Sequence, residues 1–225
     1  MIIPNSIFLK FYYPKVSFGS NVQILGIKNT QIGKGTCVGD NSWLNVCTRD
    51  SQKRIKIGQK VLIGREALIT TADNLEIGDY CVLAPRVYIS ETDHVFSDIN
   101  IPILQQGVIR GKKVIIEENC WIGINSVIIG ELIIGRGSVI AANSVVKNDV
   151  PPFSIVAGTP AKIVKMYNPS SKKWDRICDN ADMTRVLSER SKHPLISRDE
   201  YLVILNQNSN IKRIHPILAG RGISI

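Results

Sequence analysis

Aliphatic residues recur through the middle of the chain at intervals of six residues. The longest uninterrupted series comprises Ile116, Ile122, Ile128, Ile134, Ile140 and Val146. Shorter series with the same spacing precede it: Ile32, Val38 and Leu44; Ile57, Ile63 and Ile69; Ile77, Leu83 and Ile89. A period of six fits neither an amphipathic α-helix nor a strand with one buried face. It predicts a short strand and a turn repeated along the faces of a prism, with three such units in each coil.

Small residues accompany these aliphatic positions. Glycine often follows them, as a turn backbone requires, for example at Gly33, Gly64 and Gly123. Small or β-branched residues often lie two positions before them, and Cys81 and Cys120 are two of these. Because free cysteines are usually buried, we expect both to be core residues and not nucleophiles.

The spacing of six breaks within residues 44–57, 69–77 and 89–116, where loops are expected to leave the prism. The longest loop, roughly residues 91–113, contains several polar residues: Asp93, His94, Asp98, Gln105, Gln106 and Arg110. A polar loop of this length on a rigid scaffold is a common place for function.

The two ends of the chain lack the repeat. The run from Asn148 to Pro152 ends it, because paired prolines remove ladder donors. Beyond Tyr167, residues 183–190 and 199–205 have a helix-like composition. The apolar and aromatic start of the chain is interrupted by prolines and lysines, so it either lies on a surface or, more simply, caps the core.

These patterns divide the chain into three parts. We expect an N-terminal cap segment (1–20), a β-helix domain (21–161) and a C-terminal basic extension (162–225). The net charge is +9, and residues 162–225 carry twelve Lys/Arg against six Asp/Glu, which leaves +6 in the extension. That extension lacks a dense basic cluster with interleaved aromatics, so we expect no nucleic-acid binding and favour packing on an assembly.

The cysteines and the hydropathy indicate a cellular compartment. Five cysteines without a CxxC pair indicate a reduced, cytoplasmic protein. No apolar stretch of the sequence is long enough to span a bilayer.

The segment from Val114 to Lys165 carries recognisable strings: Trp121-Ile122-Gly123, Asp149-Val150-Pro151-Pro152 and Ala157-Gly158-Thr159-Pro160-Ala161-Lys162. With them, roughly residues 20–167 resemble the hexapeptide-repeat acetyltransferases, closest to those that O-acetylate sugars and polysaccharides. The resemblance implies an all-β fold, a left-handed parallel β-helix with an extended loop and a partly helical C-terminal appendage. It also implies a homotrimer with active sites between neighbouring subunits and acetyl-CoA as acyl donor.

The resemblance assigns the general base to a loop histidine, and the matching position is His94. A neutral imidazole, with a pKa of about 6.5, can accept the proton of a hydroxyl as its oxygen attacks a thioester. Asp93 would orient the imidazole or contact the acceptor. Glu66 matches a position that contacts the acceptor in relatives. Trp121 would flank the thioester or acceptor channel, with a core role as the alternative.

Further positions match those that meet CoA in the family. They are Gly123, Ile124, Ala142, Lys147, Asn148, Lys162 and Lys165. Small residues would permit close approach of the pantetheine arm, and lysines would meet the phosphates. No metal is expected, because His94 is the only histidine of the repeat region, and the other two, His193 and His215, each precede a proline as structural or surface residues.

The sequence leaves several alternatives for the acceptor and for the function. Asp93-His94-Val95 replaces the His-Pro of the galactoside and maltose enzymes, which favours relatives that modify cell-surface polysaccharide precursors. The leading hypothesis is O-acetylation of a sugar or polysaccharide precursor. A lipid-linked acceptor would bring such a protein to the inner face of the membrane, and the basic extension would approach it there. N-acylation of a nucleotide-linked amino sugar needs the same base and cofactor cleft. A non-catalytic β-helix scaffold would need neither His94 nor CoA.

Overall fold

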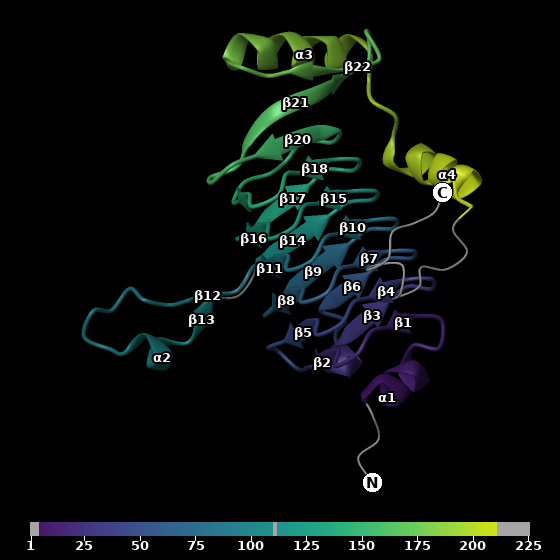
Figure 1. Cartoon of the computed structure of the whole chain (residues 1–225). Helices are drawn as coiled ribbons and strands as arrows, with labels where there is room; N and C mark the ends of the chain where they lie inside the picture. The colour runs from purple at the N-terminus through teal and green to yellow at the C-terminus, as the bar shows by residue number, and fades with distance from the viewer. Residues whose placement is uncertain (1–4, 110–111, 211–225) are drawn as a thin grey trace.

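The computed structural model describes residues 5–109 and 112–210, so Arg110 and His215 lie outside the described residues. Between residues 17 and 150 the described chain makes six coils, and each coil visits three sheets in turn (Figure 1). We call these sheets A, B and C, and their junctions the A/B, B/C and C/A edges. Within the coils every strand pairs in parallel with its counterparts in neighbouring coils. The architecture is therefore a parallel β-helix, as the period of six predicts.

The strands are short, and sheet A has the largest number of them. Sheet A contains β1 (Ser17–Phe18), β4 (Cys37–Val38), β7 (Leu62–Ile63), β10 (Val82–Leu83), β15 (Trp121–Ile122), β18 (Val139–Ile140), β20 (Ser154–Ala157), β21 (Lys162–Asn168) and β22 (Lys173–Arg176). Sheet B contains β2 (Gln23–Leu25), β5 (Trp43–Val46), β8 (Leu68–Thr71), β11 (Tyr88–Ser90), β16 (Val127–Ile129) and β19 (Val145–Val146). Sheet C contains β3 (Thr30–Ile32), β6 (Ile55–Ile57), β9 (Asn74–Ile77), β14 (Lys113–Ile116) and β17 (Leu132–Ile134).

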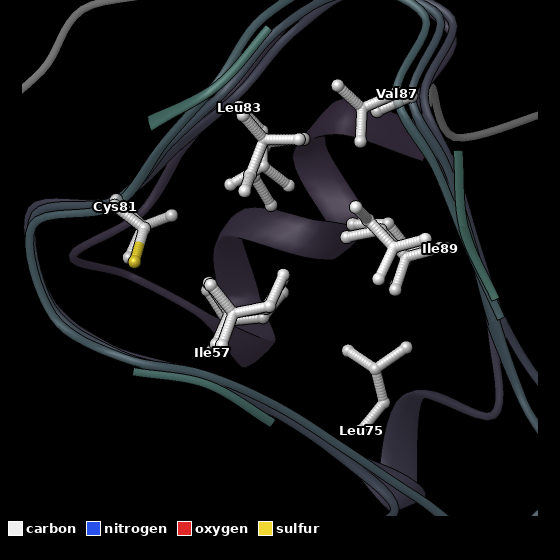
Figure 2. Packing of buried hydrophobic residues seen from close by; sticks show 14 of the residues in the cluster. Ile57, Leu75, Cys81, Leu83, Val87 and Ile89 are labelled. Carbon is white, nitrogen blue, oxygen red and sulfur yellow. The ribbon is translucent and has the colours of Figure 1, made fainter. Parts of the chain in front are cut away.

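The core fills the inside of the prism with stacked aliphatic side chains. Figure 2 shows Ile57, Leu75, Leu83 and Ile89 pointing inward from different faces, and each is at most 2% exposed. Each inward residue stacks on its counterpart in the next coil, since Leu83 pairs in register with Ile63 on one side and Ile122 on the other. Burying one such side chain contributes about 1.5–3 kcal/mol, so this stacking accounts for much of the stability.

The cysteines predicted to be core residues are buried. Cys81 and Cys120 are at most 1% exposed. Burial raises the pKa of the Cys81 thiol, which donates a hydrogen bond to the carbonyl oxygen of Glu117. A protonated, buried thiol is a poor nucleophile, so the expectation of a structural role is confirmed for Cys81.

Helix α1 (Asn5–Tyr12) covers the open end of the first coil. Leu9 of this helix is 4% exposed and belongs to the main core cluster. The Tyr13 hydroxyl lies 3.2 Å from the Ile27 carbonyl oxygen and 3.0 Å from that of Thr30. A short 3-10 helix, η1 (Ile27–Asn29), forms the nearby corner of the coil. The aromatic start of the chain is therefore fastened to the first coil.

The opposite end of the prism is closed by a hairpin and a helix. Strands β21 and β22 continue sheet A in antiparallel fashion beyond β20. Helix α3 (Asn180–Lys192) packs on them, and Met166, Ile177 and Val186 form a small second core there. The Asp179 side chain accepts the Asp182 backbone N–H and so caps the helix.

The chain then turns back along the C/A edge, where residues 196–209 form a segment that we call the C-terminal clasp (Figure 1). Most of it is helix α4 (Arg198–Asn208), which begins with a capping box of Ser197 and Glu200. The two helices of the extension confirm the prediction, made from composition, that residues 183–190 and 199–205 are helical. No described helix combines the length and apolar character needed to cross a membrane.

Candidate active site

Residues 91–109 leave the prism at the B/C edge and form a projecting arm (Figure 1). Its stalk is a two-stranded antiparallel ladder of β12 (Asp93–His94) and β13 (Val108–Ile109), in which His94 pairs with Val108. Its tip contains the short helix α2 (Ile103–Gln106). The Gln106 amide nitrogen donates to the Asp98 and Ile101 carbonyl oxygens at 2.8 and 2.7 Å. Gln106 therefore holds the tip together from inside the arm.

His94 occupies an exposed position at the start of the arm. Among the described residues, nothing forms a hydrogen bond with its imidazole. The Asp93 carboxylate accepts the backbone N–H of His94 at 2.9 Å. In this arrangement Asp93 fixes the backbone that carries the imidazole, and the ring is free to meet an external group.

The base of the arm rests on a buried carboxylate that sequence reasoning missed. Glu91 is 2% exposed, and its Oε1 accepts the Thr71 hydroxyl at 2.7 Å and the N–H groups of Ala72 and Asp73 at 2.6 and 2.8 Å. Its Oε2 is buried without a hydrogen-bond partner. These bonds tie the start of the arm to the preceding coil three residues before His94. A glutamate in a polar loop is expected to face solvent, so the sequence does not indicate that Glu91 is buried and anchors the arm.

Left-handed corner residues form a column along the A/B edge. With φ of 54–59°, the column comprises Asn21, Asn41, Glu66, Arg86, Asn125 and Asn143. Asparagine side chains form hydrogen-bonded pairs along it, with 3.1 Å between Asn21 Nδ2 and Asn41 Oδ1 and the same distance between Asn125 and Asn143. Asparagine tolerates this backbone better than most residues. Glu66 and Arg86 interrupt the column in its middle.

Glu66 is 43% exposed at this edge, and its carboxylate lies 3.8 Å from the Arg65 guanidinium. Each member of the column lies three positions before an inward aliphatic residue of sheet B, for example Glu66 before Ile69. This spacing is the sequence signal that would have revealed Arg86 beside Glu66. The edge here carries one carboxylate and two guanidinium groups facing solvent.

Trp121 lies on the outer surface of sheet A and is 55% exposed. Its partners in register are Val82 and Val139, and the row continues through Ile155 to Lys165. A core role for Trp121 is therefore wrong. The row offers an aromatic and aliphatic surface that ends at a lysine.

Three positions matched to CoA contacts lie at the A/B edge beside this row. Gly123 follows β15 directly, and a Cβ on it would lie 2.5 Å from the Ala142 nitrogen of the next coil. The Ile124 carbonyl oxygen accepts the Asn143 N–H at 2.9 Å. Gly123, Ile124 and Ala142 are thus stacked together, and glycine is required for the close contact between coils.

The remaining predicted site residues lie in two further places. Lys147 and Asn148 are exposed and follow β19 at the B/C edge, two coils beyond the arm. Lys162 opens β21 opposite Ala157, and Lys165 lies further along the same strand. Within one chain, His94 therefore shares an edge with Lys147 and Asn148. Glu66, Ile124 and Ala142 share a different edge, with sheet B between the two groups.

A pocket of about 240 Å³ lies elsewhere, between sheet C and the C-terminal clasp. Lys56, Glu76, Glu118 and Arg198 line it. Lys56 Nζ lies 2.8 Å from the Glu76 carboxylate, and Arg198 pairs with Glu118. Because these four charges are paired with one another and no predicted site residue lines the pocket, we do not assign the reaction to it.

Metal-ligating side chains are not gathered anywhere in the described ranges, where no cluster of three or more His, Cys, Asp or Glu residues has a geometry suited to an ion. The predicted site residues lie instead at the prism edges, on the outer face of sheet A and on the arm.

Comparison with known proteins shows which family has this architecture. The family model described as bacterial transferase hexapeptide (six repeats) matches residues 113–148. A probable acetyltransferase of Mycobacterium tuberculosis is 35% identical over 153 residues, covering 67% of this chain and 49% of that protein. The galactoside O-acetyltransferase of Escherichia coli is 30% identical over 138 residues, covering 61% of this chain and 66% of that protein.

A solved structure is similar as well. The hexapeptide-repeat containing acetyltransferase of Vibrio cholerae, complexed with acetyl coenzyme A, is 31% identical with a TM-score of 0.52, covering 64% of this chain and 72% of that one. The chain spans about half the length of the first curated relative, 49%, and 66% of the galactoside enzyme. The coiled architecture, the matched repeats and these similarities agree: the chain belongs to the hexapeptide-repeat acetyltransferase family.

Proposed function

We propose that this protein transfers an acetyl group from acetyl-CoA to a hydroxyl of a sugar or cell-surface polysaccharide precursor, with His94 as general base. The observation that carries the proposal is the position of His94. Its imidazole is exposed at the start of a projecting arm, and its backbone is held by the Asp93 carboxylate. The solved Vibrio cholerae relative binds acetyl coenzyme A, and the Escherichia coli relative acts on galactosides, which supports both substrate classes.

The proposed reaction needs one proton acceptor. His94 takes the proton of the acceptor hydroxyl as the hydroxyl oxygen attacks the thioester carbonyl carbon. A tetrahedral intermediate forms and then collapses with cleavage of the C–S bond. The imidazolium returns its proton to the departing thiolate, so the acetyl ester and free CoA leave a neutral His94 behind. Atoms and charges balance over the whole cycle.

The CoA contacts follow from where the small and basic residues lie. The stacked corner of Gly123, Ile124 and Ala142 offers a close backbone surface for the pantetheine arm. Lys162 and Lys165 on β21 and the pair Lys147 and Asn148 offer charge and hydrogen bonds to phosphate. Trp121, Glu66 and Asp93 are proposed to contact the acceptor and the thioester.

We further propose a left-handed coil and a homotrimer whose active sites lie between subunits. The His94 edge and the Trp121 surface lie on different parts of one prism, so a second copy must bring them together. The arm carries exposed apolar side chains that would pack on that copy. Location in the cytoplasm, at the membrane face when the acceptor is lipid-linked, completes the proposal.

The experiment is a thiol-release assay with acetyl-CoA and a panel of sugars, polysaccharide precursors and nucleotide-linked amino sugars. His94→Ala should lower kcat by about 10²–10⁴-fold, because general-base catalysis contributes that much, while CoA affinity stays within about threefold. His193→Ala is the matched control, because His193 is an exposed histidine at the end of α3.

Each outcome separates the alternatives. Undiminished turnover of His94→Ala would contradict the base assignment. Activity on the nucleotide-linked amino sugars alone would replace O-acetylation by N-acylation. A chain that does not bind CoA by calorimetry would be a scaffold and not an enzyme.

A further inference from the structure

The end of the prism that α1 covers is basic. Residues 1–39 contain four lysines, no arginine and no acidic residue. Lys10, Lys15, Lys28 and Lys34 are all exposed, on α1, on the turn after it and at corners of the first coil. Lys53, from the next coil, reaches the same corner as Lys28, because its Nζ donates to the Lys28 carbonyl oxygen at 2.6 Å.

Acidic groups of the second and third coils do not cancel this charge. Asp40 accepts the Ser20 backbone N–H at 2.6 Å. Asp50 and Asp73 both pair with the Arg54 guanidinium. The lysines of the first coil therefore face solvent with no described carboxylate committed to them.

Aromatic side chains lie in the middle of this basic end. On α1, Leu9 faces the core, while Phe8, Phe11 and Tyr12 are 47%, 84% and 43% exposed. The Tyr12 ring contacts both of the others, with centroids 5.1 Å apart for Phe8 and Tyr12 and 6.0 Å apart for Phe11 and Tyr12. A cluster of exposed rings on a fastened helix is costly in water and indicates a partner.

The charge around the rings indicates what kind of partner they meet. The arm also has exposed apolar side chains, yet residues 95–109 contain no Lys or Arg and one acid, Asp98. That surface suits an apolar protein contact. Aromatic rings surrounded by lysines match a different surface, in which rings enter the interface and ammonium groups meet lipid phosphates.

We propose that the N-terminal end of the prism, formed by Phe8, Phe11, Tyr12 and the surrounding lysines, docks on an anionic membrane. The rings would enter the headgroup region, and the lysines would bind anionic headgroups. The prism would stand on its first coil, with the arm projecting from its side (Figure 1). This proposal goes beyond acetyl transfer and does not rest on it, although it would bring the protein to a lipid-linked acceptor.

The test is co-sedimentation of the full chain with vesicles of phosphatidylcholine alone or with about one third phosphatidylglycerol. The wild-type chain should bind the anionic vesicles at least tenfold more tightly than the neutral ones, and added salt should weaken the binding. Phe8→Ser with Phe11→Ser should lower the binding at least tenfold. Lys10→Gln with Lys15→Gln should lower it to a similar degree.

Matched controls come from the opposite end of the prism. Leu187→Ser removes an exposed apolar side chain, 43% exposed on α3, and Lys172→Gln with Lys173→Gln removes two lysines from the β21–β22 turn. Both should bind within about twofold of the wild type. A melting curve for each variant checks that it is folded.

Three results would overturn the proposal. The first is absence of wild-type binding to anionic vesicles, and the second is loss of binding in the controls as large as in the N-terminal variants. The third is a change in oligomeric mass on Phe8→Ser with Phe11→Ser in the absence of lipid, which would make this face a protein contact. Because the readout is vesicle binding, failure here leaves the acetyl-transfer assay unaffected.

Discussion

Glu66 is one of the two members of the A/B column that are not asparagine. Its φ is 59°, and the same corner holds asparagine in the first, second, fifth and sixth coils. A left-handed backbone at a residue other than glycine costs on the order of 1–3 kcal/mol, and asparagine bears it more easily. Strain of this kind is often retained where a side chain has a task.

Replacing Glu66 by asparagine should therefore stabilise the protein while impairing acceptor binding. We expect an increase of roughly 2–4 °C in Tm, corresponding to about 1 kcal/mol in a chain of this size. In the acetyl-transfer assay the KM for the acceptor should rise. Arg86→Asn is the control for strain relief alone, because Arg86 has the same backbone but no assigned contact. A lower Tm for Glu66→Asn would mean that the carboxylate holds the fold.

Residues differ in how far the sequence reveals them. His94 could be found because it is the only histidine in the repeat region and lies in the longest break of the period. Glu91 could not, because its role depends on three donors from Thr71, Ala72 and Asp73 in the preceding coil. Because these donors lie in another coil, the residues next to Glu91 in the sequence do not reveal the contact.

Among the elements, α1 is attached to the first coil in part through the half-buried Tyr13 hydroxyl, which follows the helix directly. Burial raises the pKa of Tyr13 to about 12, and the hydroxyl contacts the Ile27 and Thr30 carbonyl oxygens. Since the folded state favours the protonated phenol, this contribution to stability is complete below pH 10 and is lost as the pH rises from 10 towards 12.

Alkaline unfolding should reveal this contribution. The difference in free energy of unfolding between wild type and Tyr13→Phe should narrow as the pH rises from 10 to 12. Chemical denaturation at several pH values measures it, with Tyr12→Phe as the control because that ring is 43% exposed. A difference that does not change over this range would contradict the assignment of the hydroxyl to the helix attachment.

The elements of the coils were predictable, and those outside them were predictable only in part. Inward aliphatic residues every six positions specify a strand from the local sequence alone. The same reasoning finds the arm, as a gap between Ile89 and Ile116, but not its stalk of β12 and β13. Helical composition locates α3 and α4, yet their paths depend on distant contacts such as Arg198 with Glu118.

In the molecule as a whole, the arm is the part that a single chain leaves unpacked. Ile99 and Leu104 at its tip are 94% and 88% exposed, while the inward aliphatic residues of the prism are almost completely buried. Apolar side chains presented this way usually meet a partner surface. In the proposed trimer, that surface belongs to the next copy.

Leu104→Asp should therefore shift the proposed trimer towards single chains. Size-exclusion chromatography with light scattering measures the mass, and activity should fall with it because the sites lie between subunits. Leu187→Asp places the same charge at another exposed leucine, on α3, and should leave the mass unchanged. Trimers that persist in Leu104→Asp would show that the arm tip does not hold the assembly.

The C-terminal clasp has a consequence for how the molecule comes apart. Tyr201 contacts Phe153 and Asn119, Asn206 accepts the Tyr80 hydroxyl at 2.7 Å, and Lys60 Nζ reaches Ser209 Oγ across 149 positions of sequence. A stack in which each coil contacts only its neighbours can unfold one coil at a time from either end. Because the C-terminal clasp contacts several coils at once, unfolding one of these coils also breaks the contacts of the clasp with the others. The coils between Lys60 and Phe153 should therefore unfold as one cooperative unit.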